Sequence, residues 1–153
     1  MIIVMASCFK NNDSLTIKEV VLQPNTAIVG GVLRDFSLSS YILRQDSSTL
    51  TFVGNWGIKT GLTYENTLNF TLVSKSALKV DNYYLIDTFQ TRRMNLTILL
   101  GNKFYSVRNN EISIDIERMD SIVSGLFYAT IYLNDTTTTL KSLGVRGAFS
   151  AKY

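Results

Sequence analysis

The sequence predicts an all-β fold, an antiparallel sandwich or flattened barrel of about eight to ten strands that follow one another mostly as a meander. Apolar and polar residues alternate with a period of two over most of the chain after residue 16. No long window keeps the period of an amphipathic helix. Turn-forming residues recur at short intervals, and the one proline, Pro24, precedes the regular pattern. A chain almost free of proline keeps the backbone donors that a sheet needs.

The alternation is clearest in four windows, at residues 68–72, 112–117, 127–133 and 145–152. In the second of these, Ile112, Ile114 and Ile116 fall on one side, with Ser113, Asp115 and Glu117 between them. A period of two with one apolar face is typical of antiparallel strands that pack on one side and face water on the other.

The remaining elements are placed by their turn residues. The hairpin signal at 45–48 separates two strands, and the stretches 54–57 and 59–61 are expected to end the second of them after residue 53. Asp81 and Asn82 are expected in a turn, Gly101 in a tight turn, and residues 108–110 in a connection. Before the last two windows, the predicted strands are 36–44, 49–53, 67–74, 83–87, 94–100, 104–107 and 111–117.

The composition excludes several kinds of chemistry. The chain has no histidine and a single cysteine, Cys8. Catalysis by a Ser-His-Asp or Cys-His set, a structural zinc site and an intrachain disulfide cannot be assembled from these residues. The formal net charge is only +3, and the basic residues are scattered. We therefore expect no cofactor, no metal, no enzymatic activity and no nucleic-acid partner.

The first residues resemble a lipoprotein signal. Residues 1–7 are apolar and end in two small residues before Cys8, and a polar stretch follows. The stretch is shorter than the roughly 20 apolar residues that span a bilayer. It resembles the lipobox of bacterial lipoproteins, with Met5 where that pattern usually has leucine. The hypothesis is that 1–15 is a signal remnant and tether lipidated at Cys8, and that 16–153 is one β domain. The alternative is an ordinary first strand with a buried Cys8.

The end of the chain resembles small envelope lipoproteins of the Bacteroidota. Ser124-Gly125-Leu126-Phe127 matches their Ser-Gly-x-Phe strand, and residues 147–153 match their closing Gly-x-Phe-x-x-x-Tyr strand. Their mid-chain Gly-x-Tyr is matched only in part at residues 81–84, since the glycine is absent. The family has no known function. The resemblance implies a lipid-anchored, all-β domain at the outer membrane or cell surface, and it carries over no catalytic residue.

Gly125 and Gly147 also have an interpretation that is independent of any family. A glycine within or next to an aromatic strand marks a bulge or a bend, or lets a ring from the next strand lie over bare backbone. Both glycines are therefore predicted to have structural roles.

Candidate ligand-binding residues are Trp56, Tyr64, Arg92 and Arg93. Trp56 stands in a glycine-flanked stretch within a set of aromatic residues interleaved with Asn and Thr, an arrangement that can bind sugars. Its alternative role is to close the end of the core. Arg92 and Arg93 are expected in a polar turn, where they could meet a phosphate or carboxylate or simply be solvated. The other tyrosines of the set are Tyr83, Tyr84, Tyr105, Tyr128 and Tyr132.

Asp115 and Glu117 are the one carboxylate pair with a spacing of interest. Two positions along a strand separate their backbones by about 6.6 Å, within the range of glycosidase carboxylates. The favoured interpretation is a solvated outer face.

Three functions are compatible with these observations. The leading hypothesis is a non-catalytic envelope lipoprotein, a binding or structural module with a glycan or protein partner. The second is a lipocalin-like carrier of a small apolar ligand inside a barrel. The third is a carboxylate-based glycosidase. A filled core would weigh against the carrier, and a large cavity would favour it.

Overall fold

The computed structural model describes residues 22–43, 48–84, 92–134 and 141–152. Cys8 and the predicted tether lie outside these residues. The described residues form ten strands and no helix, so they include no helix that could cross a bilayer. The strands are β1 (Thr26–Val29), β2 (Val32–Asp35), β3 (Ser37–Leu43), β4 (Thr49–Thr60), β5 (Thr63–Ser74), β6 (Asp81–Tyr84), β7 (Arg92–Leu100), β8 (Lys103–Met119), β9 (Ile122–Leu133) and β10 (Ser142–Lys152).

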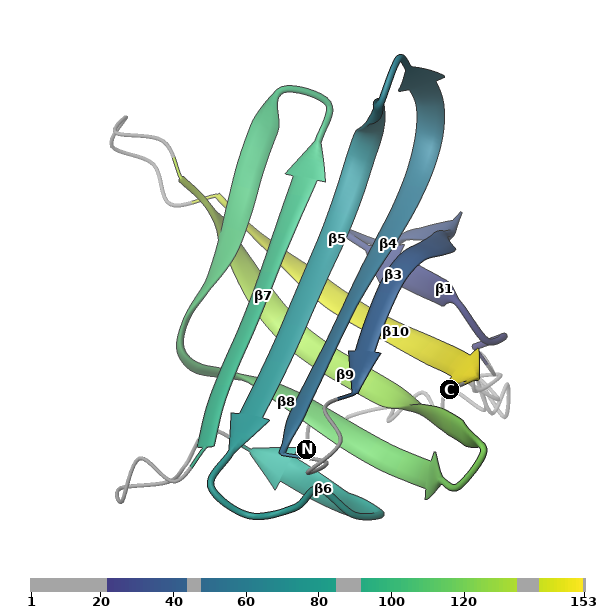
Figure 1. Ribbon diagram of the computed structural model, residues 1–153. Coiled ribbons are helices and arrows are strands. Elements are labelled where there is room, and N and C mark those ends of the chain that lie inside the picture. The colour runs from purple at the N-terminus through teal and green to yellow at the C-terminus, as the bar shows by residue number, and fades with distance from the viewer. Residues whose placement is uncertain (1–21, 44–47, 85–91, 135–140, 153) are drawn as a thin grey trace, which may run out of the picture.

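The strands form one antiparallel sheet that curls into a nearly closed barrel (Figure 1). Their order is β2-β1-β10-β9-β8-β7-β5-β4-β3, and β6 pairs with β8 outside this path. Apart from β6, strands that follow one another in the chain are neighbours in the sheet, except β2 and β3, which lie at its two ends. β1 pairs with the last strand, β10. The predicted all-β, antiparallel, mostly meander fold is confirmed.

A single residue, Phe36, connects β2 and β3, the two strands at the ends of the sheet order. β2 pairs with β1 at one end of the sheet order, whereas β3 pairs with β4 at the other. The side chain of Phe36 is buried, and a Cβ on Gly54 of β4 would lie 2.5 Å from its Cδ2. Gly54 is therefore the residue that lets the ring pack against the strand backbone.

Asn25 extends the β1–β10 pairing beyond the end of β1. Its backbone has a φ of 61°. Its side-chain amide donates to the Ser150 carbonyl oxygen at 3.3 Å, and its side-chain oxygen accepts from the Ser150 N–H at 3.0 Å. Its own carbonyl oxygen accepts the Phe36 N–H at 2.9 Å. One residue thus ties β10 to the segment that closes the barrel.

Aromatic rings fill the centre of the barrel. Phe52 stacks on Phe70 and on Phe149, with ring centroids 5.0 and 4.8 Å apart, and Phe127 lies 5.7 Å from Phe52. All four side chains are fully buried. Aliphatic residues from the same inward-facing positions surround them: Leu50, Leu68, Leu72, Leu96, Ile98, Ile114, Ile116 and Ile131.

Two predicted strand ends were wrong, because irregularities are absorbed inside longer strands. β4 does not end at residue 53 but continues through 54–57 to Thr60, inside the second of the two stretches expected to end it, with a register shift after Trp56 and a φ of 84° at Gly57. Residues 108–110 do not form a connection. They lie within β8, where the pairing with β9 shifts register between Val107 and Ile112.

Two predicted turns are also strands in the structure. Asp81 and Asn82 begin β6, where they pair with Ile116 and Asp115 of β8. Arg92 and Arg93 begin β7, where they pair with Ser74 and Val73. In both cases a neighbouring strand supplies pairing that local polarity does not reveal.

Candidate functional site

Trp56 and Tyr64 lie toward the free end of the β4–β5 hairpin. Trp56 is half-buried and packs against the hydrophobic core, as its alternative role of closing the core requires. Tyr64 is half-buried, and the Lys59 ammonium lies 5.5 Å from its ring centroid.

Arg92 and Arg93 lie at the other end of β5. The Arg92 guanidinium stands 4.8 Å from the ring centroid of Tyr83, and Arg93 is exposed. Val73, the partner of Arg93, is nine residues from Tyr64 (73 − 64 = 9), which is about 30 Å along a strand. The four predicted residues are therefore two pairs near opposite ends of β5, the first on β4 and β5 and the second on β7, and they do not form one site.

Asp115 and Glu117 lie opposite the core face of β8, as predicted. Asp115 is half-buried and pairs in register with Leu126 of β9 and Asn82 of β6. A register shift follows Ile116, and Glu117 is exposed there. Glu117 thus lies within an irregularity of the strand, and Asp115 lies before it.

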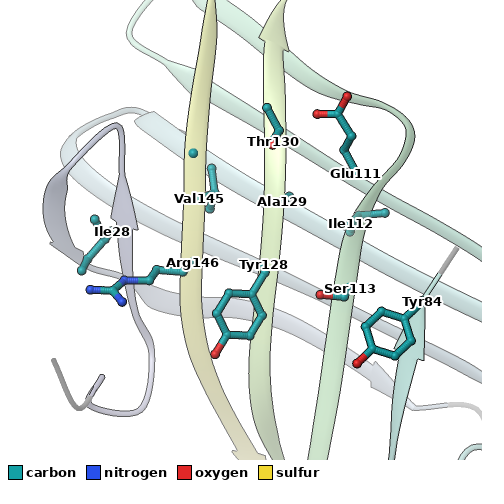
Figure 2. A pocket seen from close by; sticks show the side chains of 11 residues that line it. Ile28, Tyr84, Glu111, Ile112, Ser113, Tyr128, Ala129, Thr130, Val145 and Arg146 are labelled. Carbon is teal, nitrogen blue, oxygen red and sulfur yellow. The ribbon is translucent and has the colours of Figure 1, made fainter. Parts of the chain in front are cut away.

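A different group of residues forms a row across the outer face of the barrel. Five residues pair in one continuous register through β1, β10, β9, β8 and β6 (Figure 2). Because neighbouring strands lie about 4.8 Å apart, the row spans about 19 Å. We call it the outer row: Ile28, Arg146, Tyr128, Ser113 and Tyr84.

The outer row lines a shallow groove with a volume of about 600 Å³. Gly144 and Thr130, each two positions from a residue of the row, line the depression, and a Cβ on Gly144 would meet no atom within 4 Å. The rings of Tyr128 and Tyr84 remain 44% and 49% exposed. In Figure 2 they stand on the same face, on strands to either side of the one that carries Ser113.

A hydrogen-bonded cluster borders the groove at Glu111. The Tyr132 hydroxyl donates to Glu111, with both carboxylate oxygens 2.8 Å away, and the Arg108 guanidinium lies 5.0 Å from the Tyr132 ring centroid. The hydrogen bond to Glu111 raises the pKa of the Tyr132 hydroxyl above its ordinary value, and the Arg108 charge opposes that shift. Glu111 is therefore an acceptor that Tyr132 already holds in place.

Arg146 is the cation of the outer row. It is exposed, and it forms no ion pair with any residue in the described part of the chain. Its strand is paired on both sides, with β1 and with β9, so its backbone position is fixed. The groove therefore combines two exposed rings, hydroxyl groups and one available guanidinium.

Sequence patterns identified only part of this group. Tyr84 and Tyr128 belong to the aromatic set recognised in the sequence, and Tyr128, Thr130 and Tyr132 stand on the polar face of an alternating strand. Arg146 was visible as a polar position in the last strand. No sequence signal placed the five strands β1, β10, β9, β8 and β6 in register, so the row itself was not predicted.

The described residues include no group of three or more cysteine or acidic side chains that could hold a metal ion. In comparisons with known proteins, no family model, curated protein or solved structure matches this chain.

Proposed function

We propose that this protein is a non-catalytic binding module that holds a saccharide on the outer row. Lipidated Cys8 would anchor it to a bacterial envelope membrane. The observation that carries the proposal is the pair of exposed rings, Tyr84 and Tyr128, which flank the small residue Ser113 on one sheet face.

Exposed rings in register are well suited to a sugar. A tyrosine offers a flat apolar face and a hydroxyl, so it can stack on the C–H face of a sugar ring and hydrogen-bond to its edge. Ser113 and Thr130 add further hydroxyl groups beside the rings. Because β9 is paired on both sides, the Tyr128 ring is carried by a rigid surface and little order has to be gained there on binding, and the pairing of β6 with β8 positions Tyr84.

The carboxylates of the groove favour binding over hydrolysis. Glycosidases use two carboxylates that flank the scissile bond. Among the residues that line this groove, the single carboxylate is Glu111, whose oxygens accept the Tyr132 hydroxyl. Asp115 and Glu117, two and four positions after Ser113 on β8 (115 − 113 = 2, 117 − 113 = 4), do not line the groove.

The barrel architecture also suits a lipocalin-like carrier, which needs room for a ligand inside. The stacked rings of Phe52, Phe70 and Phe149 weigh against that alternative, because they occupy the centre where such a ligand would lie. The outer face is therefore the better-supported site.

The anchor rests on the sequence around Cys8 alone. Mass spectrometry of the protein isolated from its native membrane tests it: a diacylglycerol-modified N-terminal cysteine is expected. An unmodified thiol on a longer processed chain would contradict the anchor and leave the saccharide proposal intact.

The binding proposal is tested on a saccharide array with the full chain, followed by calorimetry on the strongest hit. Tyr128→Ala is expected to weaken that hit about tenfold, because one stacking surface is lost. Tyr128→Phe keeps the ring and should retain most of the affinity. Phe104→Ala is the matched control, since Phe104 is 46% exposed on the outer end of β8. Absence of any saccharide signal, or equal losses for Tyr128→Ala and Phe104→Ala, would refute the proposal.

A further inference from the structure

We infer that the saccharide is acidic, and that Arg146 binds a carboxylate on the sugar unit that stacks on Tyr128. This inference rests on the proposed function and specifies its ligand class. It follows from the position, the charge and the surroundings of Arg146.

Arg146 and Tyr128 are direct cross-strand partners on β10 and β9. Side chains that face each other in this way have Cβ atoms about 5 Å apart. A ring that stacks on Tyr128 therefore brings a carboxylate attached to it within reach of the guanidinium. Figure 2 shows Arg146 toward the Ile28 end of the groove and Tyr84 toward the other end. A second sugar unit would then extend over Ser113 toward Tyr84.

The charges around the groove favour an anion at this end. A guanidinium stays protonated at any physiological pH and binds a carboxylate through two parallel hydrogen bonds. No described carboxylate pairs with Arg146. The acidic residue that lines the groove, Glu111, already accepts the Tyr132 hydroxyl, and Arg108 stands over that tyrosine. The groove thus contains a cation without a protein partner and an anion that has one.

The neighbours of Arg146 strengthen this specificity. Ile28 pairs with it on β1 and offers no polar group from its side chain. Gly144, two positions away on the same strand, leaves open space beside it. A ligand carboxylate can therefore approach the guanidinium with no competing side chain at these positions.

The test compares each acidic saccharide with its carboxyl-reduced, neutral counterpart. The probes are oligosaccharides of uronic acids, presented on an array and titrated by calorimetry at low and at high salt. The full chain is expected to prefer the acidic member of a pair, and that preference should shrink as salt screens the charge. Arg146→Gln should weaken binding of the acidic member about tenfold and leave the neutral member unchanged. Arg146→Lys should lose less, because it keeps the charge without the fork.

Lys152→Gln is the matched control. Lys152 is exposed on the same strand and six positions from Arg146 (152 − 146 = 6), about 20 Å away along β10. Lys152→Gln removes the same charge as Arg146→Gln and should leave the affinity for the acidic saccharide unchanged. Equal losses for Lys152→Gln and Arg146→Gln would mean a general charge effect and would overturn the inference.

The outcomes separate the two proposals. Binding of neutral saccharides that depends on Tyr128 but not on Arg146 would overturn the acidic ligand and preserve the saccharide module. Failure of every saccharide to bind would overturn both.

Discussion

The ring of Phe127 lies against the bare backbone of Gly147. The two residues are direct partners on β9 and β10. A Cβ on Gly147 would collide with Cζ of Phe127 and would lie 2.6 and 2.9 Å from its Cε1 and Cε2. The same ring is fully buried and packs against Phe52 at the centre of the barrel. The prediction that a glycine here lets a ring from the next strand lie over the backbone is confirmed.

Gly147→Ala is expected to destabilise the protein by about 1–3 kcal/mol, because the added methyl group forces the Phe127 ring into its neighbours. Urea denaturation followed by circular dichroism measures the change in the free energy of unfolding. Gly144→Ala is the control on the same strand, where a Cβ meets open space. It should change stability by less than about 0.5 kcal/mol. An equal effect at the two glycines would contradict this explanation.

A second variant tests whether the cost comes from the ring. Phe127→Leu removes part of the side chain that the new methyl group meets. The double variant Phe127→Leu/Gly147→Ala should therefore lose less free energy of unfolding than the sum of the two single losses, with a coupling of about 1 kcal/mol or more. Strict additivity would show that the two residues do not act on each other.

Asn25 should stabilise barrel closure through its side chain and its backbone conformation. Asn25→Gly keeps the left-handed backbone but loses both hydrogen bonds to Ser150, so we expect a loss of about 1–2 kcal/mol. Asn25→Ala should cost more, because alanine also resists a positive φ. Hydrogen exchange measures the local effect: the Ser150 amide should exchange faster in both variants. Unchanged exchange at Ser150 would contradict this role.

Fold class followed from the sequence because alternation is a local property. The inward positions of β8, Ile112, Ile114 and Ile116, are buried as their period of two predicts. Strand ends were harder, because a strand can continue beyond an irregularity whose residues have no partner. Polar residues 108–110 are typical of a connection, yet they lie inside one long strand, at the point where its pairing with β9 shifts register.

The candidate site depends on register, which one sequence does not reveal. Arg146, Tyr128 and Ser113 are far apart in the chain, and their alignment follows from pairing across two strand boundaries. A shift of one residue in either pair would turn a partner to the other face of the sheet. Aromatic content therefore singled out Tyr84 and Tyr128, while their alignment with Ser113 and Arg146 required the structure. Trp56 illustrates the converse, since its type suggested binding and its position is against the core.

Trp56→Ala should act on stability and leave saccharide binding unchanged. The side chain is half-buried and packs against the core, so its loss is expected to cost about 2 kcal/mol, less than for a fully buried ring. Chemical denaturation followed by circular dichroism measures the cost, and calorimetry with the best saccharide measures binding. If the variant keeps its stability but loses saccharide binding, Trp56 belongs to the ligand site and not to the core.

The Tyr132–Glu111 hydrogen bond should give Tyr132 an unusual titration. The hydrogen bond to the Glu111 carboxylate raises the pKa of Tyr132 above its ordinary value of 10.0, because ionised Tyr132 would lose that bond and face an anion. The folded state therefore holds this proton more tightly than the unfolded state. The resulting stabilisation is fully present below pH 10 and is lost as the pH rises through the raised pKa.

Two variants should move the pKa of Tyr132 in opposite directions, as measured by NMR titration of its ring signals. Glu111→Gln removes the acceptor charge, so the pKa of Tyr132 should fall toward 10.0. The Arg108 cation over the ring favours the ionised form of Tyr132. Arg108→Gln removes that cation, so the pKa of Tyr132 should rise further. Shifts in the same direction would show that solvation, and not these two charges, controls the hydroxyl. Since Glu111 borders the groove, a bound acidic saccharide that reaches it should raise the same pKa, whereas one confined to Arg146 and Tyr128 should leave it unchanged.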